Sequence, residues 1–262
     1  MELLEHNAEA FCRLSSLLGQ ALVLVETNAK IDSKALSGNL GELQREAKRL
    51  GLSMVDKQLD RIYELLMSQQ ANSLNLSPLL KELYNRLLDE LESRAFVTIP
   101  SSDVALYKQA EPPFGHEVQS KFPRASYDID EACKCVALGR STAGVFHLMR
   151  VMEIALRAVN TCLGGSLNLA GNEKNWGSLL NSIRDARNAK DASAPKGSKW
   201  QEKDLFAEIY ALLDAVKDAW RNSTMHIERT YTDPEARAVL VTVKNFMQKL
   251  ADRMDEAGQP LT

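Results

Sequence analysis

Apolar residues recur every three or four positions through most of the chain, which is the spacing of an amphipathic helix. Over residues 3–26 the apolar positions are Leu3, Leu4, Phe11, Leu14, Leu17, Leu18, Leu22 and Val25. The same spacing covers 33–50, which is stopped by Gly51, then 53–70, and a segment that Ser77-Pro78 opens and that reaches Leu91. We therefore predict an N-terminal array of helical hairpins over residues 1–95.

The helical pattern breaks between residues 96 and 122. Residues 96–100 (Phe-Val-Thr-Ile-Pro) favour a strand, and residues 111–115 contain two prolines and a glycine. We interpret 96–122 as a linker with a short extended segment, followed by a second domain over 123–262. Its helices are predicted at about 123–139, 141–163, 175–189, 203–222 and 234–256. Long helices with mostly short links favour an up-down bundle, so the chain is predicted to be all-α.

Composition narrows the function classes. The net charge is −3 and the pI about 5.9, so the chain as a whole does not attract a polyanion and any nucleic-acid contact has to be local. No apolar run reaches the ~18–20 residues of a membrane span, and the N-terminus has no cleavable leader pattern. We expect a cytoplasmic protein without a membrane partner.

Motif searches exclude several kinds of site. The sequence contains no phosphate-binding glycine loop, no dinucleotide fingerprint, no H-E-x-x-H and no G-x-S-x-G. The four histidines are dispersed, and the closest cysteines, Cys133 and Cys135, have C-x-C rather than zinc-site spacing. We expect no metal and no cofactor, and we interpret the cysteines as buried thiols.

A polar stripe interrupts the segment 141–163, which is otherwise apolar nearly all round and is predicted to be the central helix. The four residues of the stripe fall within an arc of roughly 120° on a helix. They are His147, Arg150, Glu153 and Arg157. Because a buried charge is costly without a partner, the stripe is predicted to face a subunit interface or an active-site groove. The alternative is an internal ladder in which Glu153 pairs with Arg150 or Arg157.

The second candidate lies where the segment 203–222 ends, in the run Trp220-Arg221-Asn222-Ser223-Thr224-Met225-His226. An arginine at a helix C-terminus often does no more than interact favourably with the last backbone carbonyls of the helix. A histidine in a loop is often only a structural hydrogen-bond partner. The spacing Arg221-Asn222-x₃-His226, placed between two long helices, resembles the signature of HEPN domains. The resemblance covers about residues 123–256 and leaves the N-terminal region outside.

The resemblance to HEPN domains implies a helical bundle that forms a homodimer and cleaves RNA without a metal. His226 would move the proton of a ribose 2′-hydroxyl or of the leaving oxygen, and Arg221 would hold the phosphate. Asn222 would bind a phosphate oxygen or orient His226, while Glu153 would hold Arg221. The implied products are a 2′,3′-cyclic phosphate and a 5′-hydroxyl. Family members serve as toxins or in antiphage defence, which also implies an antitoxin or other partner protein.

Further RNA contacts are predicted from charge. Residues 184–203 carry six basic and three acidic side chains in a chain that is acidic overall. We predict that Lys196 and Lys199, together with Arg150 and His147 of the stripe, bind the RNA backbone. A solvated surface loop is the alternative for the lysines. For the whole chain, the alternative to the nuclease is a non-catalytic helical dimer that binds RNA, a nucleotide or a protein through the same surface.

Overall fold

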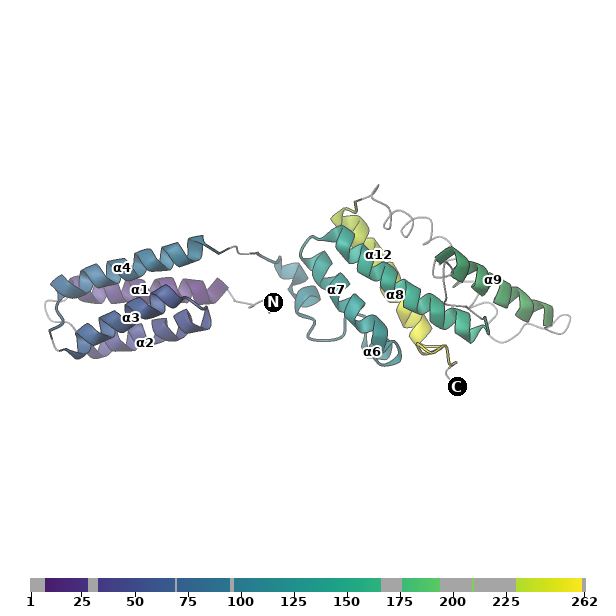
Figure 1. Ribbon diagram of the computed structural model, residues 1–262, viewed down its shortest axis with the longest axis horizontal. Helices are drawn as coiled ribbons and strands as arrows, with labels where there is room; N and C mark the ends of the chain where they lie inside the picture. Colours follow the sequence, from purple (N-terminus) through teal and green to yellow (C-terminus); the bar gives the residue numbers. More distant parts are fainter. Residues whose placement is uncertain are drawn as a thin grey trace. The chain divides into compact units, whose positions relative to one another are not determined.

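The amphipathic segments fold into two helical units. The computed structural model describes residues 8–27, 33–68, 70–94, 97–165, 176–193, 209 and 230–260. Within these ranges the regular structure is helical, apart from one isolated bridge between Met254 and Pro260. The units are Met1–Val97 and Thr98–Thr262 (Figure 1). The all-α prediction is confirmed, and none of the described helices is both long and apolar enough to cross a bilayer.

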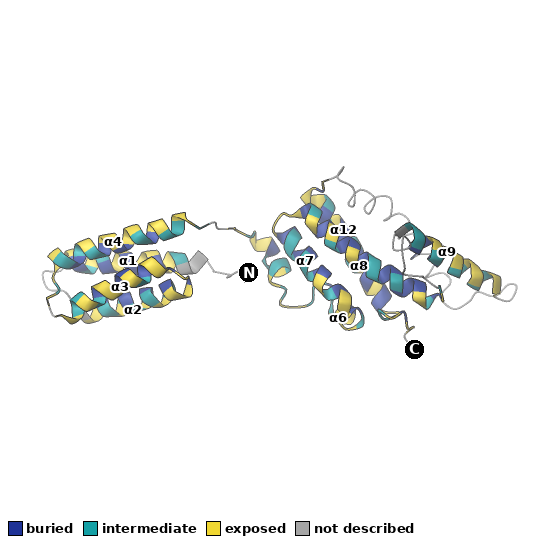
Figure 2. Cartoon of the chain, in the orientation of Figure 1, coloured by how far each residue is buried: buried dark blue, intermediate teal, exposed yellow. Residues whose placement is uncertain are grey.

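The first unit is a bundle of four helices. These are α1 (Ala8–Thr27), α2 (Ser33–Arg49), α3 (Ser53–Met67) and α4 (Ser73–Glu92). Each helix packs against the next, and α4 also packs against α1, which closes the bundle (Figure 1). The buried faces, dark blue in Figure 2, are rich in leucine. Burying one such side chain fully contributes about 1.5–3 kcal/mol to the stability of the fold. The amphipathic spacing therefore explains why these four helices pack into a bundle.

Helix α4 begins four residues earlier than Ser77-Pro78 predicted. Asn72 caps the helix: its side chain accepts hydrogen bonds from the backbone N–H groups of Leu74 and Asn75, and the Asn75 side chain accepts one from the Asn72 N–H. Pro78 lies inside the helix. The capping box therefore determines the start of α4, although Pro78 removes one backbone donor further along.

The second unit is built around one long helix. Its elements are η1 (Ser101–Asp103), α5 (Val104–Lys108), α6 (His116–Lys121), η2 (Pro123–Ala125), α7 (Ser126–Ala137), α8 (Ser141–Cys162), α9 (Trp176–Ser193) and α12 (Asp233–Ala251). Helix α8 packs against α7, α9 and α12 (Figure 1), which confirms its predicted central place. Ile209 is buried in the same core.

Residues 98–122 belong to the second unit, whereas the sequence suggested a linker. Phe114, Val118 and Phe122 are almost fully buried in its core. The carbonyl of Phe114 accepts a hydrogen bond from Gln248 on α12 at 3.1 Å. The breaker residues turn the chain, but the apolar side chains that follow pack against distant helices, which local sequence does not reveal. Residues 97–100 form neither a helix nor a paired strand.

The end of the described chain folds back onto the second unit. Helix α12 ends at Ala251, five residues before the predicted end, and the backbone N–H of Glu256 donates to the carbonyl of Lys121 at 2.8 Å. Gly258 has φ +75°, and a Cβ there would lie 2.6 Å from the carbonyl oxygen of Ala158 on α8. This close approach needs glycine and places Glu256 beside the start of α7.

Candidate functional site

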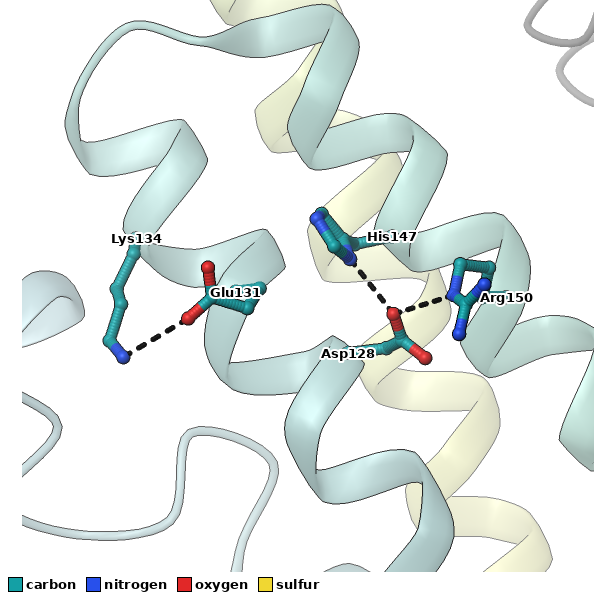
Figure 3. Close-up of polar contacts among 5 residues, drawn as sticks. All are labelled: Asp128, Glu131, Lys134, His147 and Arg150. Atoms are coloured by element: carbon teal, nitrogen blue, oxygen red, sulfur yellow. Dashed lines mark hydrogen bonds and ion pairs between the residues drawn. The ribbon is translucent and has the colours of Figure 1, made fainter. Parts of the chain in front are cut away.

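The polar stripe of α8 meets a buried carboxylate of α7. Asp128 has only 5% of its side chain exposed, and its Oδ1 atom lies 2.8 Å from Nδ1 of His147 and 2.7 Å from Nε of Arg150 (Figure 3). One oxygen therefore holds two side chains that lie one turn apart on α8. This three-residue contact is the Asp128 cluster.

Close packing of two antiparallel helices builds the Asp128 cluster. Helices α7 and α8 are joined by a three-residue turn, and Gly144 on α8 lies directly against α7. A Cβ on Gly144 would be 2.9 Å from a methyl carbon of Val136 and 3.3 Å from the carbonyl oxygen of Ala132. Since no side chain separates the helices there, Asp128 can reach across to α8.

The electrostatics of the cluster favour a permanently charged Arg150. The hydrogen bond that Arg150 donates to Asp128, and then the negative charge of Asp128, raise the pKa of the Arg150 guanidinium above its ordinary value. The Arg150 side chain is 56% exposed, and only its Nε donates to Asp128 among the contacts of the described residues. Its two terminal nitrogens are thus available to an anion such as a phosphate.

The Asp128 carboxylate also orients His147. When the imidazole is neutral, a donor at Nδ1 leaves the lone pair on Nε2. The structure gives Nε2 no partner among the residues that it describes. Nε2 of the neutral His147 imidazole can therefore accept a hydrogen bond from a ligand.

A groove of about 400 Å³ opens beside the Asp128 cluster. Its lining includes Arg124, Asp128, Arg150, Glu153, Ile154, Arg157 and Glu256. Each acidic side chain in the lining contacts an arginine: Glu153 accepts from Arg157 at 2.6 Å, and Glu256 lies 3.4 Å from Arg124. The carboxylates thus position three guanidinium groups around one groove, which is a geometry suited to phosphate groups.

The structure brings three of the predicted site residues together: His147 and Arg150 in the Asp128 cluster, and Glu153 in the groove. Glu153 pairs with Arg157 four residues on, as the internal-ladder alternative predicted, whereas Arg150 pairs across the helices with Asp128. The other predicted residues lie outside the described part of the chain. They are Arg221, Asn222, His226, Lys196 and Lys199. The contact between Glu153 and Arg221 stays a prediction.

Sequence reasoning missed three groove residues, Arg124, Asp128 and Glu256. A signal for Asp128 was present, because it shares a helix face with the buried Ala132 and Val136, four and eight residues on. A carboxylate on an apolar face needs a buried partner, and the stripe of the next helix offered one. Arg124 and Glu256 meet only through the fold of the chain end, for which the sequence gives no local signal.

The cysteines differ from the prediction that all of them are buried. Cys133 is buried, Cys12 is exposed, and Cys135 and Cys162 are partly exposed. Burial, assisted by the nearby Asp130 carboxylate, raises the pKa of the Cys133 thiol to about 12, so it is a poor nucleophile at neutral pH. In the described part of the chain, no three His, Cys, Asp or Glu side chains are grouped closely enough to hold a metal ion.

Comparison with protein-family models, with curated proteins and with solved structures found no match.

Proposed function

We propose that this protein is a metal-independent endoribonuclease. The observation that carries the proposal is Arg150, which Asp128 holds by Nε at the edge of a groove that two further arginines line. Such a groove can take the phosphates of an RNA strand although the chain is acidic overall. Arg221 and His226 are the proposed catalytic pair, on the basis of their resemblance to the HEPN signature.

The proposed chemistry is an internal transfer at phosphorus. The ribose 2′-oxygen forms a bond to the phosphorus while the bond from phosphorus to the 5′-oxygen breaks. A histidine takes the 2′-proton, and a protonated histidine supplies a proton to the leaving oxygen. Arg221 stabilises the charge that builds up on the phosphoryl oxygens, and Asn222 donates to one of them. The products are a 2′,3′-cyclic phosphate and a 5′-hydroxyl.

A homodimer would supply two Arg–His pairs to one cleft. In this proposal Glu153 is a positioning residue for Arg221. Its Oε1 accepts from Arg157, and among the described residues Oε2 has no partner, so the carboxylate can take a second guanidinium. The same surface would serve a toxin or a defence protein, with an antitoxin-like protein as a regulating partner.

The test is cleavage of a labelled RNA in excess EDTA between about pH 5.5 and 8.5, the range in which an imidazole titrates. We expect wild-type protein to release fragments with a cyclic phosphate end. His226→Ala and Arg221→Ala should abolish cleavage without lowering the melting temperature. Glu153→Ala should reduce both cleavage and the melting temperature, because it removes a partner of Arg157. A DNA copy of the substrate should resist cleavage, since it lacks the attacking hydroxyl.

Two results would overturn the proposed nuclease activity. One is binding of RNA without cleavage at any pH in this range, which would favour the non-catalytic dimer. The other is cleavage that His226→Ala leaves unchanged, because a contaminating nuclease would then be its source. Comparing the His226→Ala preparation with the wild type, purified in parallel, therefore serves as the internal control.

A further inference from the structure

Two exposed aromatic rings flank His147. Tyr127 precedes Asp128 on α7 and is 67% exposed, and Phe146 precedes His147 on α8 and is 41% exposed. The imidazole meets both rings edge to face: its centroid lies 6.4 Å from Tyr127 with the planes at 75°, and 6.2 Å from Phe146 with the planes at 81°. Three rings from two helices therefore gather at one place on the surface.

The position of these rings follows from that of the Asp128 cluster. Asp128 points into the contact between α7 and α8, so its neighbour Tyr127 lies on the outer side of α7. Phe146 has the same relationship to the buried Val145 on α8. Tyr127 is also close enough to Arg150 to affect its guanidinium electrostatically. Aromatic surface and a fixed positive charge thus lie side by side.

This combination limits what can cover the rings. An apolar helix or a second apolar surface would cover Tyr127 and Phe146 but would also bury the terminal nitrogens of Arg150, and buried N–H donors without an acceptor are costly. A ligand that joins a flat ring to an anionic group satisfies both features. A nucleotide has this structure, since its base stacks on aromatic side chains and its phosphate accepts hydrogen bonds from guanidinium groups.

We propose that Tyr127 and Phe146 form a stacking subsite for an unpaired base of single-stranded RNA, while Arg150 holds the adjacent phosphate. The choice of RNA rests on the proposed function. A duplex keeps its bases stacked on each other, and therefore only a single strand can place one on these rings. The protein is thus expected to select single strands by stacking and not by base sequence.

Equilibrium binding tests the subsite apart from catalysis. The probe is a short fluorescent RNA with 2′-O-methyl groups, which cannot be cleaved by 2′-oxygen attack. We expect the single strand to bind more tightly than its duplex. Tyr127→Ala should weaken binding by about 5- to 150-fold, the usual effect of losing one stacked base. Tyr127→Phe should bind within about twofold of wild type, because the ring is kept. Tyr84→Ala, at an exposed tyrosine of α4, is the control and should bind as wild type.

A set of probes, each lacking one base, identifies stacking itself. For wild-type protein, removing the stacked base should weaken binding about as much as Tyr127→Ala does. For the Tyr127→Ala protein, the same probe should bind no worse than the intact strand, because the contact is already gone. Sedimentation of both proteins, without RNA, shows whether the variant changes the oligomeric state.

Distinct results separate this inference from the nuclease. Equal affinity of wild type and of the Tyr127→Ala and Phe146→Ala variants overturns the subsite, even if the protein cleaves RNA. Loss of binding in Tyr127→Ala without any cleavage by wild type supports the subsite and overturns the nuclease. If Tyr127→Ala instead dissociates a dimer, the rings form a contact between copies, and the subsite is wrong. No RNA binding by wild type overturns both.

Discussion

The Nε atom of Arg150 lies 2.7 Å from Oδ1 of Asp128, a carboxylate buried where α7 and α8 pack together. An arginine held by Nε keeps its two terminal nitrogens on the outer edge of the guanidinium, where they can form a fork around a phosphate. The same oxygen accepts from His147. Asp128 thus makes the stripe part of a site, whereas pairing within α8 alone would only stabilise one helix.

Replacing the charge of Asp128 should reduce both stability and RNA binding. Asp128→Asn keeps the size of the side chain but leaves Arg150 without its buried counter-charge and weakens the hydrogen bond with His147. Since both partners are partly exposed, we expect a loss of about 1–2 kcal/mol in the free energy of unfolding, measured with urea. RNA affinity should fall because a neutral amide oxygen holds Arg150 less firmly than the carboxylate does.

Glu131→Gln is the matched control for Asp128→Asn. Glu131 lies one turn further along α7 and pairs at 3.2 Å with Lys134, and both side chains are partly exposed (Figure 3). Such a pair contributes little, so neither stability nor binding should change measurably. Equal effects of the two substitutions would mean that the buried contact has no special role.

Gly144→Ala tests whether the close approach of α7 and α8 maintains the site. Alanine is the better helix former, but its Cβ would lie 2.9 Å from Val136 and force the helices apart. We expect a net loss of about 1–3 kcal/mol, as for other overpacked contacts, together with weaker RNA binding.

Gly19→Ala provides the comparison for Gly144→Ala. Gly19 lies in the interior of α1, and apart from its chain neighbours and the backbone of its own helix no atom lies within 4 Å of a Cβ placed there. This substitution should therefore stabilise the protein by about 0.5–1 kcal/mol. Thermal unfolding of both variants checks that the two substitutions change the stability in opposite directions. If Gly144→Ala is stabilising, the two helices can separate without cost.

The Cys133 thiol gives a pH-dependent prediction. Its ordinary pKa of 9.0 is raised to about 12 by burial, so the folded state holds this proton more tightly than the unfolded state does. The stabilising effect is complete below pH 9 and is lost as the pH rises toward 12. Titration with a chromogenic disulfide at about pH 8, below the ordinary thiol pKa, should label the exposed Cys12 readily and leave Cys133 unreacted until the protein unfolds. Rapid labelling of Cys133 in folded protein, seen by peptide mapping, would contradict its burial.

Periodicity predicted the helices well because each amphipathic face reflects one local pattern. The segment 141–163 became α8 (Ser141–Cys162), and its central place followed from its apolar surface. Contacts between distant segments were not predictable in this way. The burial of Phe114 depends on helix α12, more than a hundred residues later in the chain. Likewise, the two partners of Asp128 depend on how α7 packs against α8, which the periodicity of a single helix does not predict.

A second buried carboxylate, Asp103, joins the start of the second unit to α12 through hydrogen bonds with Arg237. Arg237 donates from Nη1 and Nη2 to the two oxygens of Asp103 at 2.9 and 2.8 Å, and from Nε to Asp233 at 2.8 Å. These hydrogen bonds, those to Asp103 first, raise the pKa of Arg237 above its ordinary value, so its charge persists at every pH where the protein is studied. The contact joins η1 to α12, outside the groove.

Arg237→Lys should therefore destabilise the protein although it keeps the charge. A lysine has one nitrogen and cannot donate to both oxygens of Asp103 in a fixed fork, so we expect a loss of about 1–2 kcal/mol in urea unfolding. Arg237→Ala should cost more, about 2–4 kcal/mol, because it leaves Asp103 buried without a partner. Adding Asp103→Ala to Arg237→Ala should recover part of that loss, since the unpaired charge is removed as well. Arg45→Lys, at an exposed pair on α2, should have no measurable effect. If Arg237→Lys unfolds at the same urea concentration as wild type, the two hydrogen bonds to Asp103 do not stabilise η1, and other contacts of this segment, such as those of Phe114 and Phe122, hold it in place.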